Sequence, residues 1–523
     1  MRSLVRVVTN SESAAVDASA IDSGIPSRAL MQRAGSAAAA EIALRYRDAL
    51  DAGVLVLAGP GNNGGDAWVV ARSLVAAGVR VRVVEPIPAK TSDAQAEREL
   101  ALAVLDSTKV VSGSLPTSLD LGEAIVVDGL LGTGTTGPLR GPIGEAVTAL
   151  QNIAPRVATI VALDVPSGLD ASAGTGTCAP AQLTLTFGTV KRGHLVNRDV
   201  CGAVVVLDIG LDAHAGRVGA PMLVDEPWVA ERVPRIGASA HKGTRKKIAI
   251  VGGAAGMAGA SVLAARAAMR SGIGMVKLVV ESASVPVVQE TEPYALAAAW
   301  PEDDEGIDRD ICSWADAVVI GPGLGRGKPS RELLERVLRI WKGPTLLDAD
   351  AITLFEGRVA RLAELLASRP ALLTPHPAEL ARLAGRTVDE ILSARFDAGR
   401  EMSGALGATV LLKGTPTVIS SADGQRLVSA TGTPALATAG SGDVLSGIAA
   451  TLLAQLADSF VAGAIGAWIH GHAAERVPAT KDRIVRGIAL EDIVAELRDV
   501  WTFDERPSRY PILAELPPVG GDR

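Results

Sequence analysis

The chain has 523 residues, of which 48% are apolar and 3% aromatic, and its 51 basic and 58 acidic side chains give a formal net charge of −7. At about 100–200 residues per domain, this length predicts two or three domains, each able to bury a substantial core. The lack of a basic excess argues against a nucleic-acid-binding surface, and the scarcity of aromatic residues argues against base stacking.

Neither the first residues of the chain nor its cysteines suggest export. The three cysteines are scattered and form no CxxC pair, which argues against a zinc site or a disulfide framework. No secretory signal is evident, so we expect a cytoplasmic protein. Residues 447–469 are long and apolar enough to suggest a membrane span, but Gln455, Asp458 and Ser459 interrupt them. We therefore expect two buried helices joined by a short turn, and no membrane association.

Short apolar runs alternate with helix-like segments in the first half of the chain. Residues 1–50 are expected to be helical with a break at 24–26, and 67–78 to form a helix. The expected strands are residues 54–58, 79–85, 124–128 and 157–164. This alternation predicts a parallel sheet with helices on both faces, in which ligands bind beyond the carboxyl ends of the strands.

A second α/β series begins near residue 246. Its expected strands are residues 246–251, 317–320, 345–348, 371–374 and 409–412. Residues 225–240 contain two prolines and a glycine and are expected to form a linker, whereas the proline-rich residues 501–523 are expected to form a tail. The sequence therefore predicts a first domain over residues 1–224 and a second over 241–500.

The turn after the first strand carries two competing signals. Gly59–Gly64 fits G-x-G-x-x-G, and Glu85 lies about 20 residues further on, where an acid that binds ribose would sit in a nicotinamide-dinucleotide site. The continuing run Asn62–Asp66 instead places amide and carboxylate oxygens in a glycine-rich turn, which suits a cation or sugar hydroxyls. A loop merely capped by Asn and Asp is the alternative.

Two further polar turns follow neighbouring strands. The turn from Asp128 to Gly137 is rich in glycine, and its amides could cradle phosphates. Asp164 opens the next turn, which also contains Ser167. We expect Asp66, Asp128, Asp164 and Ser167 to converge at one edge of the sheet. Lys191 could compensate charge or transfer a proton, or it could be a solvated lysine.

The motifs NNGGD, DGLLGTGTTGPLRGP, LDVPSGLDASAGT and TFGTVKRGH, in this order, resemble the N-terminal domain of the bifunctional NAD(P)H-hydrate repair enzymes. In that family, this domain epimerises the R and S forms of the hydrates NADHX and NADPHX. The resemblance implies a Rossmann-like, three-layer domain and a potassium ion (K⁺) held by Asn63, Asp128 and Ser167. The hydrate-binding residues that it implies are Asn62, Asn63, Gly64, Gly65, Asp66, Gly132, Thr133, Gly134, Thr135, Thr136, Gly137, Pro138 and Asp164.

In the second half, small residues at 438–442 and Asp443 lead directly into an apolar helix over 444–453. Free amides at a helix start stabilise phosphate oxygens, and a carboxylate beside them can accept a proton from a hydroxyl. A helix-capping aspartate is the alternative. Residues 321–328 superficially resemble a phosphate-binding loop, but Pro322 and Pro329 stand where G-x-x-x-x-G-K-[ST] requires Gly and Ser or Thr.

Together with HKG at 241–243, LDAD at 347–350, TPHPAE at 374–379 and LLKGTPT at 411–417, this segment resembles the ribokinase-like C-terminal domain of the same enzymes. There, the domain dehydrates (S)-NAD(P)HX using ADP, or ATP in eukaryotic relatives. His376 and Glu379 occupy the place of an N-x-x-E element that arranges Mg²⁺ around phosphates. We expect Asp443 to be the catalytic base, ADP the co-substrate and the protein a homo-oligomer. The resemblance implies nucleotide contacts from Lys413, Gly414, Thr415, Pro416, Thr417 and Gly442, and hydrate contacts from Ala260, Gly323, His376 and Asp443.

Two other functions fit parts of the chain. A ribokinase-like kinase of a vitamin precursor, fused to a Rossmann-like partner, would explain the second half but does not carry NNGGD and DVPSG. A binding protein would explain the first half but leaves Asp443 and Lys413 without a role. The sequence leaves open the choice of ADP or ATP and of NADHX or NADPHX.

Overall fold

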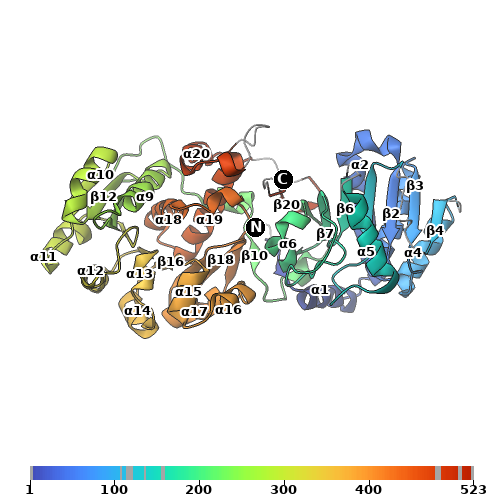
Figure 1. Cartoon of the computed structure of the whole chain (residues 1–523), viewed down its shortest axis with the longest axis horizontal. Coiled ribbons are helices and arrows are strands. Elements are labelled where there is room, and N and C mark those ends of the chain that lie inside the picture. The colour runs from blue at the N-terminus through green and yellow to red at the C-terminus, as the bar shows by residue number, and fades with distance from the viewer. Residues whose placement is uncertain are drawn as a thin grey trace. The chain divides into compact units, whose positions relative to one another are not determined.

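The computed structural model describes residues 4–106, 109–113, 122–134, 137–154, 159–477, 485–504 and 509–519 (Figure 1). The chain divides into two compact units, Met1–Ala220 with Arg506–Val519 and Pro221–Glu505 with Gly520–Arg523. Each unit is built on one large, mostly parallel sheet, as the alternation of strands and helices predicts.

The first unit has an eight-stranded sheet in the order β20-β9-β7-β6-β5-β2-β3-β4, in which only the β20–β9 pair is antiparallel. Its strands are β2 Val54–Ala58, β3 Val81–Glu85, β4 Val110–Ser112, β5 Ile125–Gly129, β6 Thr159–Leu163, β7 Leu183–Phe187, β9 Ala203–Leu207 and β20 Ile512–Leu516, beside a separate parallel pair of β1 Val7–Val8 and β8 Val190–Lys191. Its helices are α1 Asn10–Asp22, α2 Ser27–Arg45, α3 Asn62–Ala76, α4 Ser92–Leu102, α5 Gly141–Ile153, α6 Arg192–Val196 and α7 Asp212–Ala215.

Helices cover both faces of this sheet. Val54 and Val56 of β2 pack with α1, α2 and α3 in one apolar cluster. Leu55 and Leu57, which point the other way because side chains alternate along a strand, pack with α5 in a second cluster. The first unit is therefore a three-layer α/β structure.

The end of the chain returns to the first unit. Residues 501–523, expected as a tail, include β20, which pairs antiparallel with β9 at the edge of the first sheet. Glu515 of β20 accepts two 3.0 Å hydrogen bonds from the guanidinium of Arg45, and Arg509 donates to Glu41 on the same helix α2. The strand thus closes an edge that would otherwise present unpaired backbone groups.

The second unit has a ten-stranded sheet in the order β10-β19-β18-β17-β16-β15-β14-β11-β12-β13, in which β18 runs antiparallel to both neighbours. Its strands are β10 Met222–Leu223, β11 Lys247–Gly252, β12 Met275–Val280, β13 Leu296–Ala299, β14 Ala317–Ile320, β15 Thr345–Leu347, β16 Ala371–Leu373, β17 Thr409–Leu412, β18 Thr417–Ser420 and β19 Arg426–Ser429. Its helices are α8 Glu226–Arg232, α9 Ala258–Arg270, α10 Val285–Thr291, α11 Asp304–Ile307, α12 Lys328–Ile340, α13 Asp350–Thr353, α14 Val359–Leu366, α15 Pro377–Ala384, α16 Val388–Ser393, α17 Ala398–Leu406, α18 Ser441–Leu456, α19 Ser459–Arg476 and α20 Leu490–Glu496.

The boundary between the units differs from the expected one. Residues 222–223, expected in the first domain, form β10 and pair with β19 of the second sheet. The expected linker, residues 225–240, contains α8, which Asp225 caps by accepting a 3.0 Å hydrogen bond from the Trp228 amide. Pro227 stands in the first turn of α8, where proline is tolerated, so it does not prevent this part of the segment from being helical.

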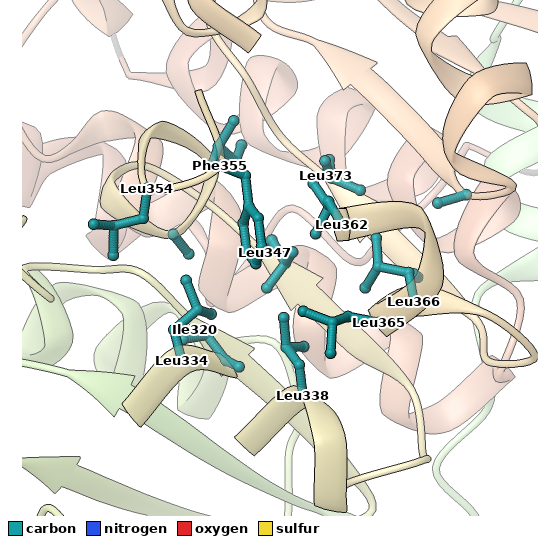
Figure 2. Packing of buried hydrophobic residues seen from close by; sticks show 14 of the residues in the cluster. Ile320, Leu334, Leu338, Leu347, Leu354, Phe355, Leu362, Leu365, Leu366 and Leu373 are labelled. Atoms are coloured by element: carbon teal, nitrogen blue, oxygen red, sulfur yellow. The ribbon is translucent and has the colours of Figure 1, made fainter. Parts of the chain in front are cut away.

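Figure 2 shows the apolar layer on one face of the second sheet. Ile320, Leu347 and Leu373 extend from three neighbouring strands against leucines of α12 and α14 and against Phe355. On the other face, α9, α18 and α19 pack closely, and a side chain at Gly447 would lie 2.1 Å from the Ala264 carbonyl oxygen.

The long apolar stretch at 447–469 is a helical hairpin. Helix α18 ends at Leu456, and its C-cap Ala457 has a left-handed φ of 53°. Helix α19 begins after Asp458, which accepts hydrogen bonds from two amides of its first turn. The prediction of two buried helices is confirmed. Throughout the part of the chain that the structure describes, no helix is both long and apolar enough to span a membrane.

Candidate active sites

The polar turns of the first unit meet because β2, β5 and β6 are adjacent parallel strands. Glycines bring these turns into close contact. A Cβ on Gly59 would lie 1.7 Å from the Leu130 carbonyl oxygen, and a Cβ on Gly64 would lie 1.8 Å from the Gly59 carbonyl oxygen. Both positions therefore exclude any larger residue.

The NNGGD segment is helical, which the sequence did not suggest. Helix α3 begins at Asn62, directly after its N-cap Gly61, so Asn62–Asp66 form its first turns and not a loop. Glycine is a poor helix former. Here the close packing of Gly64 against Gly59 and of Gly65 against Met31 outweighs the low helix propensity of these two glycines.

Asn63, Asp128 and Ser167 form one hydrogen-bonded cluster. Ser167 Oγ donates to Asp128 Oδ1 at 2.6 Å, and its amide donates to Asp128 Oδ2 at 2.8 Å. The Leu131 backbone links the remaining members, since it accepts from Asn63 Nδ2 at 2.7 Å and donates to Ser167 Oγ at 2.9 Å. Burial raises the pKa of Asp128, and the hydrogen bonds from Ser167 oppose that shift.

One atom of this cluster is left without a partner. Among the described residues, no group hydrogen-bonds the buried Oδ1 of Asn63. A buried amide oxygen beside a carboxylate and a hydroxyl is the type of oxygen donor set that a hard cation takes. These three residues therefore fit the expected K⁺ site.

A second polar cluster surrounds Asp164. Lys191 Nζ donates to Asp164 Oδ1 and, at 2.8 Å, to Thr186 Oγ1, which in turn donates to Asp164 at 3.1 Å. The Lys191 side chain is only 2% exposed, so the alternative of a solvated lysine is wrong. Desolvation raises the pKa of Asp66 well above its usual range, and the charges of Asp164 and Asp17 raise it further.

The glycine-rich turn lies beside these clusters. Gly132 packs against Asn63, and Gly132, Gly137 and Pro138 line a cavity of about 1010 Å³ together with α5 and the turn at 168–177. Thr133 and Gly134 form a turn next to Gly132. Thr135 and Thr136 lie outside the described residues.

Glu85 does not serve as a ribose-binding acid. It is buried and accepts hydrogen bonds from Arg98 Nε at 2.7 Å and from Ser112 Oγ at 2.8 Å. Its carboxylate is thus occupied within the protein, which removes the main support for a nicotinamide-dinucleotide site at Gly59–Gly64.

In the second unit, Asp348 is the centre of the polar network. It is buried at the end of β15, where its Oδ1 accepts from Lys413 Nζ and Thr374 Oγ1 and its Oδ2 from Ser446 Oγ, each at 2.8 Å. The next residue, Ala349, has φ of 49°, a strained conformation for a residue with a Cβ, as is common at functional sites. Desolvation would lower the pKa of Lys413, but Asp348 and Glu379 raise it overall, which keeps the ammonium charged.

Asp443 and Gly442 lie beside this network at the start of α18. A Cβ on Gly442 would lie 3.2 Å from Lys413 Nζ, so the two predicted nucleotide-binding positions are neighbours. Desolvation raises the pKa of Asp443 to about 7, with a further contribution from Asp348 that Lys413 opposes. The N-cap of α18 is Gly440, which provides no side-chain cap.

The remaining predicted residues lie on adjoining segments. His376 caps α15 by accepting from two amides through Nδ1, and its Nε2 lies 3.4 Å from Glu379. Gly323, after β14, packs against Ala260 in the first turn of α9. Gly414, Thr415 and Pro416 form the loop between β17 and β18, and Thr417 donates to the Gly414 carbonyl oxygen at 3.1 Å.

Comparisons with known proteins find relatives of both units. Residues 27–193 match the family described as YjeF-related protein N-terminus, and residues 248–497 match NAD(P)H-hydrate dehydratase. Relatives named bifunctional NAD(P)H-hydrate repair enzyme Nnr include one from Salinibacter ruber, 36% identical over 88% of this chain and 89% of its own. Another, from Escherichia coli, is 34% identical over 90% and 89% respectively. The chain belongs to the bifunctional NAD(P)H-hydrate repair enzymes.

Family membership covers both units, whereas each alternative function explained only one half of the chain. A solved structure of an ADP/ATP-dependent NAD(P)H-hydrate dehydratase from Bacillus subtilis, co-crystallised with ATP and Mg²⁺, is 29% identical and covers 53% of this chain and 96% of its own, with a TM-score of 0.46. The family matches confirm the resemblance of the motifs to this family. The two mostly parallel sheets with their helices confirm the α/β fold class.

Proposed function

We propose that the first unit interconverts the R and S forms of NADHX and NADPHX, and that the second dehydrates the S form at the expense of ADP, giving AMP and phosphate. The observation that carries the second activity is Asp443, a carboxyl with a pKa of about 7 at a helix start beside the buried Lys413–Asp348 pair. The first activity rests on the clusters around Asp128 and Asp164.

Dehydration requires a better leaving group than hydroxide, and the second unit has the groups to make one. Asp443 takes the proton from the hydrate's hydroxyl, whose oxygen attacks the terminal phosphorus of ADP while AMP departs. Lys413 and the first amides of α18 stabilise the charge on the transferred phosphoryl group. The ring nitrogen then expels phosphate, and loss of a ring proton restores the dihydropyridine.

Mg²⁺ fits this site as an ion carried by the nucleotide. Within the described ranges, no group of three or more acidic, histidine or cysteine side chains could hold a metal by itself. Mg²⁺ commonly binds through substrate phosphates and only one or two carboxylates, and Glu379 could supply one of these. When bound, it would neutralise phosphate charge during the transfer.

The proposal is tested by incubating hydrated NADH with the protein, Mg²⁺ and ADP, and following the near-ultraviolet absorbance of the reduced nicotinamide. We expect the absorbance to return fully when both epimers are present, because epimerisation feeds the dehydratase. ATP in place of ADP tests the nucleotide preference. No return with either nucleotide would contradict the proposal. The homo-oligomeric state and the cytoplasmic location stay predictions.

Epimerisation is expected to depend on a monovalent cation. Asn63, Asp128 and Ser167 fit K⁺, and the phosphates of the hydrate would approach the carboxylates of this edge, so a cation reduces their repulsion. Replacing K⁺ by a bulky organic cation should slow epimerisation and leave dehydration of the S form unchanged. Equal epimerisation rates in both cations would contradict the K⁺ site.

A further inference from the structure

Asp348 joins the ends of three neighbouring strands of the second sheet to helix α18. Strands β15, β16 and β17 are adjacent and parallel, and Asp348, Thr374 and Lys413 are the first residues after them. Asp348 Oδ1 accepts from Lys413 Nζ and Thr374 Oγ1, and its Oδ2 accepts from Ser446 Oγ of α18, each at 2.8 Å. One carboxylate therefore links four elements at the edge of the sheet where ligands bind.

The two members of the Asp348–Lys413 ion pair differ in their access to a ligand. The Asp348 side chain is only 2% exposed, and both of its oxygens accept from protein groups, so it does not itself contact a substrate. The Lys413 side chain is 20% exposed, and its Nζ lies 3.2 Å from where a Cβ on Gly442 would stand, in the first turn of α18. Lys413 is thus the member of the pair that can reach a phosphate.

The backbone of Asp348 is itself firmly held. Leu347, directly before it, belongs to the buried apolar layer in Figure 2. The Asp348 amide donates to the Ile320 carbonyl oxygen at 3.1 Å, and the Asp348 carbonyl oxygen lies 1.8 Å from where a Cβ on Gly321 would stand. Asp348 is therefore a fixed point to which a mobile side chain can be tied.

A lysine that must meet a phosphate benefits from such a fixed point, because its ammonium is carried on a flexible four-carbon chain. Protein kinases place a phosphate-binding lysine in the same way, through an ion pair with a glutamate. Here the carboxylate that binds Lys413 is also bonded to Ser446, three residues after Asp443 on α18. The ammonium is therefore held in a defined place relative to the helix start that carries Asp443.

We propose that Asp348 is a positioning residue of the dehydratase, which holds the Lys413 ammonium against the first turn of α18, where the transferred phosphoryl group is bound. The assignment rests on the proposed dehydratase activity of the second unit. The LDAD motif by itself gives this aspartate no role.

The test measures dehydration of the S form of hydrated NADH by the full chain with ADP and Mg²⁺. Asp348→Asn keeps the size of the side chain but removes the charge that orients Lys413. We expect kcat to fall about 10²-fold, the usual effect of a small misplacement at a reacting centre. The KM for ADP should stay within a few fold, because the misplacement acts on the transfer step. A kcat within a few fold of the wild-type value would overturn the proposal.

A double variant shows whether Asp348 acts through Lys413. Lys413→Met should lower kcat by at least as much as Asp348→Asn. If the only task of Asp348 is to hold Lys413, adding Asp348→Asn to Lys413→Met should change kcat by no more than a few fold. Two losses that multiply in the double variant would show that Asp348 acts independently of Lys413 and would overturn the positioning role.

Ser446→Ala provides a milder test, because each charge substitution leaves one member of a buried pair without its partner and could destabilise the second unit. This variant keeps both charges and removes only the donor to Asp348 Oδ2, so kcat should fall several-fold. Thr451→Val is the matched control. It also removes a buried hydroxyl from α18, but this hydroxyl donates to backbone carbonyl oxygens. Equal kcat values for these two variants would overturn the proposal even if Asp348→Asn failed to fold.

The pH profile gives a readout that loss of packing alone would not move. Desolvation, with contributions from Asp348 and Asp350, raises the pKa of Asp443 to about 7, and Lys413 opposes this shift. Asp348→Asn removes one of these negative charges, so its residual dehydration should begin to rise at lower pH than in the wild type. Ser446→Ala keeps every charge and should leave the profile in place. An unmoved profile for Asp348→Asn would overturn the role of its charge.

Failure of this role and failure of the proposed function are separable. R-to-S conversion of hydrate enriched in the R form, followed by chromatography without nucleotide, reports on the first unit and should stay at the wild-type rate in every variant. A wild-type chain that dehydrates the S form, together with an Asp348→Asn variant of nearly unchanged kcat, overturns the positioning role alone. A wild-type chain that does not dehydrate the S form overturns the proposed dehydratase function itself.

Discussion

Asp443→Asn is expected to lower nucleotide-dependent dehydration by about 10²–10⁴-fold, because asparagine keeps the size of the side chain but cannot accept the hydroxyl proton. The wild-type rate should rise as pH increases through about 7. Desolvation and Asp348 raise the pKa of Asp443 to that value, so the carboxylate needed as base is lost below it. The residual rate of the variant should lack this rise.

Asp458→Asn is the matched control for this prediction. Asp458 caps the neighbouring helix α19 by accepting 3.0 Å hydrogen bonds from the Phe460 and Val461 amides. Its replacement is expected to cost at most about 1 kcal/mol of stability and no activity. If a well-folded Asp443→Asn protein behaved like this control, Asp443 would not be the base. Epimerisation should be unchanged in both variants.

Gly64→Ala is expected to abolish epimerisation and destabilise the first unit by about 1–3 kcal/mol, the usual cost of an added methyl in a tightly packed site. The new Cβ would lie 1.8 Å from the Gly59 carbonyl oxygen, so the start of α3 must move away from that turn. Such a movement separates Asn63 from Leu131 and breaks the cluster around Asp128. Thermal unfolding and the R-to-S assay measure the two effects.

Gly61→Ala is the control for this substitution. Gly61 lies in the same turn, has φ of −98°, and has nothing within 4 Å of its added Cβ. Alanine is less favourable than glycine at this N-cap, so a small loss of thermal stability is expected, but the epimerisation rate should be kept. Equal behaviour of the two alanine variants would show that close packing at Gly64 is not required.

The meeting of polar turns in the first unit could be predicted from the sequence for a simple reason. Asp128 lies at the carboxyl end of β5 and Ser167 follows β6. An α/β alternation makes such strands parallel, and the carboxyl ends of parallel strands share one edge of a sheet. The same rule applies to Asp348, which ends a strand in the second unit. Its position as the centre of a buried network depends on Lys413 and Ser446, which lie on distant segments.

Other features depended on tertiary contacts that local patterns do not contain. The burial of Lys191 follows from pairing with Asp164, whose left-handed φ of 61° no sequence rule assigns to aspartate at that position. The helical state of Asn62–Asp66 runs against the propensity of two glycines and results from packing. Asp17 lies in an ordinary surface helix, and nothing in its neighbours in sequence indicates a link to Asp66.

The pairing of β20 with β9 has a consequence for how the protein is made. Strand β20 of the first sheet follows residues 221–505 of the second unit in the chain, although the other strands of that sheet come before them. Most strands of the first unit are therefore synthesised early, but the β9 edge stays unpaired until the residues of β20 have also left the ribosome. Chains that stop before β20 retain an unpaired strand edge, which favours aggregation. The sheet of the first unit therefore gains β20 only in chains that also carry the second unit.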